Sequence, residues 1–147
     1  NFLRSQYRAG SLHVRRLLAA DTLRQKTSLR AKILNIAANY DLNLGQPDSA
    51  RNWVQESIQL SAEIGDEDTR QKGIATLTQI YLRLGEHELS LNLSKEQLQY
   101  LIDRKEWSRA AACYFAICLA NLQLGNFEEV TAETAADIRD TEDVDYE

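Results

Sequence analysis

The chain has 147 residues, of which 44% are hydrophobic and 27% charged, with six glycines, one proline and a net charge of −5. No apolar run approaches the roughly 20 residues that cross a bilayer, and no charged stretch followed by an apolar stretch opens the chain, so we expect neither a membrane-spanning nor a visibly targeted protein. The few glycines and the lone proline also exclude a turn-rich all-β protein, so we expect helices.

Helices are predicted, in chain order, at residues 7–23, 29–44, 48–64, 68 or 69–84, 87–104, 106–124 and 127–139. Within each segment, the apolar residues return to one broad face at helical spacing. Gly45 is predicted to end the second helix in a left-handed conformation, and Pro47 suits the first turn of the third. The short loops between these segments predict antiparallel helix hairpins.

A repeat of 40 residues underlies this pattern. The dipeptide Leu-Gly occurs at residues 44–45, 84–85 and 124–125, and Leu34, Ile74 and Tyr114 also align at this spacing. The repeats comprise residues 31–70, 71–110 and 111–147, and residues 1–30 form half a repeat in which Gly10 occupies a small-residue position. The sequence therefore predicts an all-α solenoid of about three and a half helix hairpins.

Residues 80–86, Ile-Tyr-Leu-Arg-Leu-Gly-Glu, resemble the end of the first helix in the tetratricopeptide repeat family, in its long-period form of about 40 residues. Residues 126–129, Asn-Phe-Glu-Glu, are similar to the turn of that family. Asp41 and Asn121 stand where Tyr81 provides the usual aromatic residue. The resemblance implies one right-handed α-solenoid domain over residues 1–147, whose concave groove binds another protein.

The resemblance also implies which side chains line the groove, because they project from the first helix of each repeat. These are Lys32, Asn35, Asn39 and Asn43, then Lys72, Ala75, Gln79 and Arg83, then Phe115, Leu119 and Gln123. Some members of the family hold a terminal carboxylate with a Lys and an Asn, to which the group of Lys32, Asn35 and Asn39 is similar. Alternatively, Phe115 and Leu119 pack beneath a neighbouring repeat or domain. Trp53 and Trp107 are predicted to fill space between helices.

Charge is unevenly distributed. Residues 1–32 carry eight basic side chains and one acid, whereas residues 126–147 carry nine acids and one base. This polarity would allow head-to-tail self-association, but solvated helix faces and a frayed acidic terminus are the preferred interpretation. Binding of nucleic acid by the basic end is a weaker alternative because no helix-turn-helix signature is present.

The chain offers little catalytic chemistry. His13 and His87 lie in different repeats, and no phosphate-binding loop or nucleophile elbow appears, so we predict no metal, no cofactor and no enzymatic activity. Cys113 and Cys118 would point about 140° apart on one helix and cannot pair there, and the lack of a disulfide framework predicts a cytoplasmic protein.

We therefore expect a protein–protein interaction module that binds a peptide or a partner helix. The alternative is a sensory or regulatory segment of a multidomain signalling protein whose output domain lies outside these residues. Because the chain has no methionine, we expect it to be part of a longer or processed polypeptide.

Overall fold

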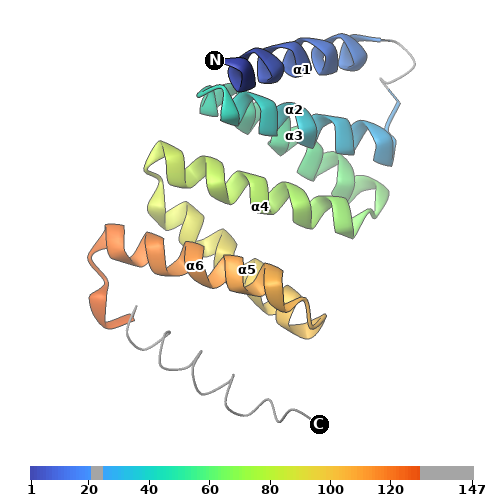
Figure 1. The fold of residues 1–147 in the computed structure, drawn as a ribbon. Helices are drawn as coiled ribbons and strands as arrows, with labels where there is room; N and C mark the ends of the chain where they lie inside the picture. The colour runs from blue at the N-terminus through green and yellow to red at the C-terminus, as the bar shows by residue number, and fades with distance from the viewer. Residues whose placement is uncertain (21–24, 130–147) are drawn as a thin grey trace. The chain divides into compact units, whose positions relative to one another are not determined.

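A computed structural model of the protein describes residues 1–20 and 25–129. These residues form six α-helices and no strand: α1 (Phe2–Ala19), α2 (Ser28–Asn43), α3 (Pro47–Ile64), α4 (Glu67–Leu84), α5 (His87–Asp103) and α6 (Trp107–Leu124) (Figure 1). The predicted all-α class is confirmed for this part of the chain, and α2 to α6 begin and end within two residues of the predicted bounds. Residues 130–139 of the helix predicted at 127–139 lie outside the described residues.

The first helix begins five residues earlier than predicted. The side chain of Asn1 accepts a hydrogen bond from the backbone N–H of Leu3 at 3.2 Å and so caps the N-terminus of α1. This helix ends at Ala19, before the predicted end at residue 23.

The chain divides into two compact units, residues 1–85 and 86–147. In the first unit, α2 contacts α1, α3 and α4, and α3 also packs on α4. In the second unit, α5 packs against α6. Each unit therefore contains at least one hairpin of sequential helices, as the 40-residue pattern predicts.

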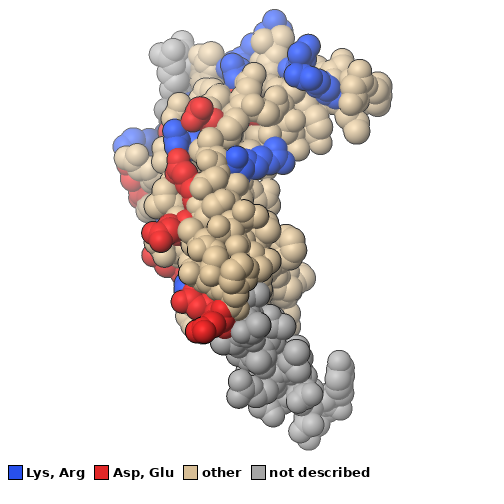
Figure 2. Space-filling view, turned by 90° about the vertical axis from the view of Figure 1, so that its left-hand side faces the viewer, with Lys and Arg blue, Asp and Glu red and all other residues tan. Residues whose placement is uncertain are grey.

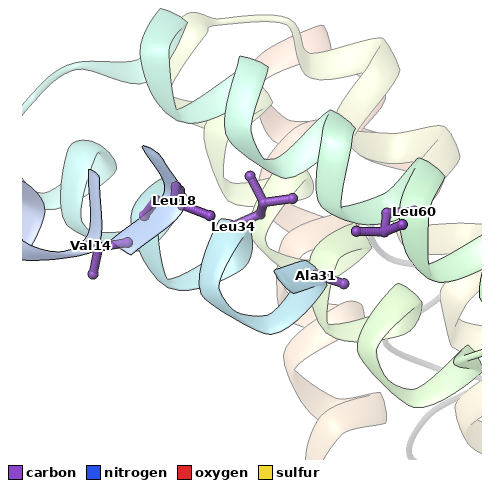
Figure 3. Packing of buried hydrophobic residues seen from close by; sticks show 6 residues of the cluster. Val14, Leu18, Ala31, Leu34 and Leu60 are labelled. Carbon is purple, nitrogen blue, oxygen red and sulfur yellow. The ribbon is translucent and has the colours of Figure 1, made fainter. Parts of the chain in front are cut away.

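Buried aliphatic side chains hold each unit together. In the first unit, Val14 and Leu18 of α1 meet a cluster that includes Ala31, Leu34 and Leu60 (Figure 3). Trp53 packs against this cluster while half-buried, which confirms its predicted packing role. In the second unit, Leu101, Ala110 and Cys113 form the core.

Trp107 does not follow the prediction. Its side chain is 59% exposed at the start of α6, so it is a surface residue rather than a filler between helices. Cys113 and Cys118 form no disulfide, as predicted. Within the described ranges, no helix combines the length and the apolar character needed to cross a bilayer.

Glycines end the helices at the predicted positions. Gly45, Gly65, Gly85 and Gly125 all have positive φ, between 74° and 78°, which is the left-handed conformation that closes a helix. The turn between α5 and α6 has Lys105 at the position that Gly65 occupies one repeat earlier, and its φ is 57°. Lys105 is the one described non-glycine residue with positive φ.

Close packing explains the small residue at position 10. A Cβ atom on Gly10 would lie 2.6–2.9 Å from three atoms of the Tyr40 side chain, so the ring fits against the bare backbone of α1. Tyr7 meets the same ring edge-on, with centroids 6.1 Å apart. These contacts place α1 against α2.

A buried carboxylate joins three helices of the first unit. Asp41 of α2 accepts hydrogen bonds from Ser11 Oγ at 3.0 Å and Arg15 Nη2 at 2.9 Å, both on α1. On α3, Trp53 Nε1 donates to it at 3.0 Å, and Ser49 Oγ donates as well. We call Asp41 and these four donors the Asp41 hub. Because the carboxylate is fully buried, these partners offset its desolvation.

Candidate functional site

The predicted groove residues of the first two repeats lie on two helices in contact, α2 and α4, within the first unit. The α2–α4 surface, as we name it, comprises Lys32, Asn35, Asn39 and Asn43 on α2 and Lys72, Ala75, Thr76, Gln79 and Arg83 on α4. Asn35 and Ala75 are half-buried and Thr76 is buried, whereas the other side chains are exposed. The surface therefore offers amides, a hydroxyl and cations to a ligand.

Two polar contacts fix α4 against α2. The side-chain amide of Asn39 donates to Thr76 Oγ1 at 3.5 Å, and Arg83 Nη1 donates to the backbone carbonyl of Leu42 at 2.7 Å. The carbonyl of Leu42 lies in the last turn of α2, where it also accepts from the backbone N–H of Gly45 at 3.1 Å and where the negative end of the helix dipole favours a cation. Arg83 therefore holds α4 against α2 and so stabilises the α2–α4 surface.

The asparagines follow one another along α2 at intervals of four residues. Asn39 Nδ2 donates to the carbonyl of Asn35 at 2.9 Å, and Asn43 Nδ2 donates to the carbonyl of Asn39 at 2.8 Å. Because these amide nitrogens face their own helix, the Oδ1 atoms of Asn39 and Asn43 are available as acceptors. The buried Oδ1 of Asn35 receives no hydrogen bond from any described residue.

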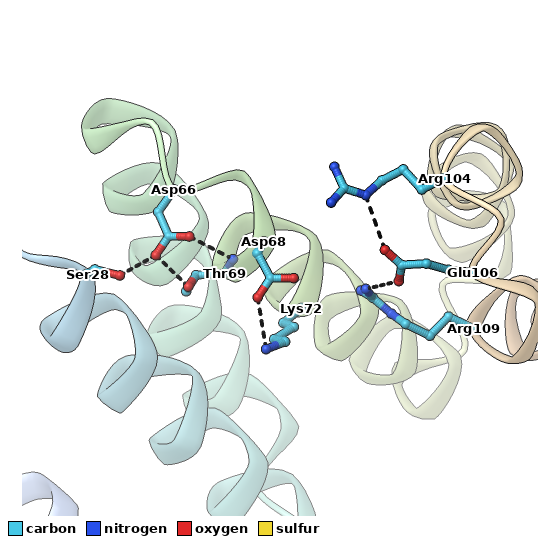
Figure 4. A network of polar contacts seen from close by, with 8 residues as sticks. All are labelled: Ser28, Asp66, Asp68, Thr69, Lys72, Arg104, Glu106 and Arg109. Carbon is cyan, nitrogen blue, oxygen red and sulfur yellow. Dashed lines mark hydrogen bonds and ion pairs between the residues drawn. The ribbon is translucent and has the colours of Figure 1, made fainter.

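Acids accompany the cations of the surface. Lys72 Nζ lies 3.0 Å from Asp68 Oδ2, one helical turn earlier, in an exposed pair (Figure 4). Asp66, which caps α4, accepts hydrogen bonds from the hydroxyl of Ser28, from Thr69 Oγ1 at 2.6 Å and from the backbone N–H of Thr69 at 3.1 Å. These bonds, helped by the charge of Lys32, lower the pKa of Asp66 to about 2.

The network around Asp66 joins the start of α2 to the start of α4. Ser28 is the first residue of α2, and Thr69 lies in the first turn of α4 (Figure 4). A carboxylate that stays charged at neutral pH also suits the positive end of the α4 dipole. The two helices that carry the surface are thus tied at both ends, by Asp66 at one and by Arg83 at the other.

Phe115 and Leu119 belong to the second unit, on α6. Phe115 is 70% exposed and Leu119 is half-buried. Gln123, on the same helix, is exposed. The structure therefore groups the predicted polar residues of α2 and α4 in one unit and the predicted apolar residues in the other.

The basic end of the chain corresponds to α1. This helix carries Arg4, Arg8, Arg15 and Arg16 and no acid, and Arg15 is bound to Asp41. Figure 2 shows Lys and Arg side chains gathered over the part of the first unit where α1 lies. Most of the acidic end, residues 130–147, lies outside the described residues, so head-to-tail association stays a prediction.

Sequence reasoning missed Thr76, which contacts Asn39 across the two helices, and selected its neighbour Ala75 instead. The signal was available, because Thr76 follows Lys72 by four residues and so shares its helix face. The Asp41 hub was missed as well.

Among residues 1–20 and 25–129, no His, Cys, Asp and Glu side chains are grouped in threes as a metal site requires. The thiol of Cys113 lies in the core of the second unit, where burial raises its pKa against the opposing influence of Arg109. The thiol donates to the side-chain carbonyl of buried Gln97 at 3.6 Å, and a buried, protonated thiol of this kind is a packing group. No protein-family model matches the sequence, and no curated protein matches it either.

Proposed function

We propose that the chain is a tetratricopeptide-like α-solenoid that binds a peptide or a partner helix on the α2–α4 surface. One observation carries this proposal: α2 and α4 are in contact, and both carry exposed amide and cationic side chains at the predicted groove positions. The 40-residue spacing of the left-handed glycines supports the solenoid.

The chemistry of the surface suits a polypeptide ligand. A peptide backbone presents N–H donors and C=O acceptors in alternation, and asparagine and glutamine side chains can satisfy both. The free Oδ1 atoms of Asn39 and Asn43 would accept from N–H groups, while the amide of Gln79 and the ammonium of Lys32 would donate to carbonyl groups. A ligand carboxylate could displace Asp68 and pair with Lys72, because the exposed Lys72–Asp68 ion pair is weak.

The test uses a random peptide library displayed on phage and selected against the full chain. Enriched peptides are synthesised, and their affinities are measured by fluorescence anisotropy for the wild type and for Lys72→Glu, Arg83→Glu and Asn39→Leu. We expect each substitution to weaken binding by about tenfold: Lys72→Glu and Asn39→Leu each remove one hydrogen bond to the ligand, and Arg83→Glu removes the bond that holds α4 against α2.

Matched controls separate the site from general effects of charge and shape. Lys95→Glu reverses an exposed charge on α5, and Asn52→Leu replaces an exposed asparagine on α3; both should bind as the wild type does. Circular dichroism checks that the variants keep their helices. The proposal fails if no peptide is enriched, or if the enriched peptides bind all five variants equally well.

A further inference from the structure

The exposed side of α1 carries several arginines and no acid. We name it the α1 basic face and define it by Arg4, Arg8, Leu12, Arg15 and Arg16, all of which are exposed. The helix contains no Asp or Glu. Residues 1–85, which form the first unit, carry twelve basic and eight acidic side chains, so this unit is positively charged although the whole chain is negative.

Most of the charge on this face is not neutralised by the described part of the chain. Arg15 is held by the buried carboxylate of Asp41 at 2.9 Å, and its side chain remains 45% exposed. Arg4, Arg8 and Arg16 form no ion pair with any described residue. Figure 2 shows the basic side chains that gather over this part of the first unit. The α1 basic face therefore attracts anions.

The 40-residue repeat shows that these positions stay exposed even on a helix with neighbours on two sides. Positions 8, 12, 15 and 16 of α1 are equivalent to 48, 52, 55 and 56 of α3 and to 88, 92, 95 and 96 of α5. α3 packs against both α2 and α4, yet its four positions are exposed, as are the four of α5. The exposure of the α1 basic face is therefore a property of these repeat positions.

The chemistry of the face, in contrast, is particular to α1. Its equivalents are acids and amides with one lysine: Asp48, Asn52, Gln55 and Glu56 on α3, and Glu88, Asn92, Lys95 and Glu96 on α5. Only α1 has a basic set, and only α1 has an apolar residue, Leu12, where the other two helices have asparagine. The Leu12 side chain is 51% exposed. Contact with water requires neither the change of sign nor the leucine.

A surface that is both anionic and apolar matches these side chains. Guanidinium groups bind phosphate oxygens through paired hydrogen bonds, in a fixed geometry that a lysine ammonium lacks. Leu12 lies among the arginines and would leave water where phospholipid head groups meet the acyl chains. The backbone of a nucleic acid supplies phosphate groups but no apolar layer, so the leucine favours a lipid surface.

We propose that the α1 basic face binds a membrane surface that contains anionic phospholipids, with α1 parallel to the plane of the membrane. From Arg4 to Arg16 the face extends about 18 Å along the helix, so its four arginines reach several lipid head groups at once. Each basic residue near such a surface strengthens binding by about fivefold, so the association is peripheral and reversible. It does not rest on peptide binding at the α2–α4 surface.

Co-sedimentation of the full chain with lipid vesicles tests the proposal. We expect binding to phosphatidylcholine vesicles that contain about 30% phosphatidylserine, little binding to pure phosphatidylcholine, and release at about 1 M salt, where charges are screened within about 3 Å. Arg8→Glu/Arg16→Glu should weaken binding at least about 25-fold. Lys72→Glu/Lys95→Glu is the matched control, because it changes the net charge equally at two exposed lysines of α4 and α5, and it should bind nearly as the wild type does.

A leucine variant distinguishes lipid from nucleic acid. Leu12→Ser should weaken binding to the anionic vesicles about threefold, because the leucine no longer leaves water at the lipid interface. Leu89→Ser, at a leucine of α5 that is 47% exposed, is the control and should bind as the wild type does. Fluorescence anisotropy with a labelled DNA duplex measures nucleic-acid binding under the same conditions. Circular dichroism checks that each variant keeps its helices.

Absence of binding to the anionic vesicles at about 0.1 M salt, where the screening length is about 10 Å, overturns the proposal. Equal weakening by the two double charge variants overturns it too. An unchanged affinity of Leu12→Ser for the vesicles overturns the lipid contact, and binding of the DNA duplex would then assign the face to nucleic acid. Peptide binding on the α2–α4 surface is measured separately, so its presence or absence leaves these outcomes unchanged.

Discussion

The indole Nε1 of Trp53 donates a hydrogen bond to the buried carboxylate of Asp41 at 3.0 Å, which links α3 to α2 in the first unit. The same carboxylate is bound by Arg15 of α1, whose side chain is 45% exposed whereas that of Asp41 is 1% exposed. A charged group withdrawn from water in this way is stable only while its partners stay in place.

Replacing Asp41 by Ala should destabilise the protein by about 3 kcal/mol, because the donors of Trp53 and Ser11 and the charge of Arg15 lose their acceptor inside the fold. Urea unfolding followed by circular dichroism measures the change in the free energy of unfolding. Asp48→Ala is the control, since the side chain of Asp48 is 79% exposed beside Arg51, and it should cost less than about 0.5 kcal/mol. Equal effects of the two substitutions would contradict the structural role of the hub.

Replacing Lys105 by Gly should stabilise the protein by about 0.5–1 kcal/mol. The left-handed conformation costs a non-glycine residue about 1–2 kcal/mol, and the greater freedom of glycine in the unfolded chain offsets part of the gain. The mirror experiment is Gly65→Lys, which should destabilise by a similar amount, because φ at Gly65 is 74° and no atom would obstruct a Cβ there. Chemical unfolding of both variants checks the pair, and a stabilising Gly65→Lys would refute this account of the turn.

The stability contributed by Asp66 should depend on pH. The pKa of Asp66 is lowered to about 2 from the ordinary value of 3.8, so the charged form is favoured in the folded protein. Its contribution is present above pH 4 and is lost as the pH falls from about 4 to 2. Ser28→Ala removes the largest cause of the shift, so it should raise the pKa of Asp66 and lower stability at pH 6 more than at pH 2.

Nuclear magnetic resonance titration of the Asp66 carboxyl group gives its pKa directly, and urea unfolding at the two pH values gives the stability. Ser108→Ala, at an exposed serine of α6, is the control and should show the same small effect at both pH values. An unchanged pKa in Ser28→Ala would show that Thr69 alone holds the carboxylate in its charged form.

The helices and their ends could be predicted from the sequence because their causes are local. Gly45, Gly85 and Gly125 permit the left-handed turn, and Pro47 begins the next helix without needing a donor. The side chains of the α2–α4 surface could be grouped from the 40-residue repeat. Positions 40 residues apart are equivalent, and equivalent positions of successive helix hairpins lie on equivalent faces.

The contacts between distant residues could not be predicted. The donors to Asp41 come from positions 11, 15, 49 and 53. No local sequence pattern pairs these positions with Asp41, which aligns with the aromatic Tyr81 of the next repeat. The left-handed conformation of Lys105 was not predicted, because the usual sequence signal for that conformation is glycine. Trp107 was wrongly placed between helices because the hydrophobicity of a residue does not by itself tell which helix face is covered.

The Asp41 hub also leads us to expect an order of events in folding. Its donors on α3 lie 8 and 12 residues from Asp41, whereas those on α1 lie 30 and 26 residues away. Short chain loops close first, because closure entropy increases with loop length. We therefore expect the α2–α3 hairpin to assemble around the carboxylate before α1 joins it, and α1 to detach from the hub before α2 and α3 separate.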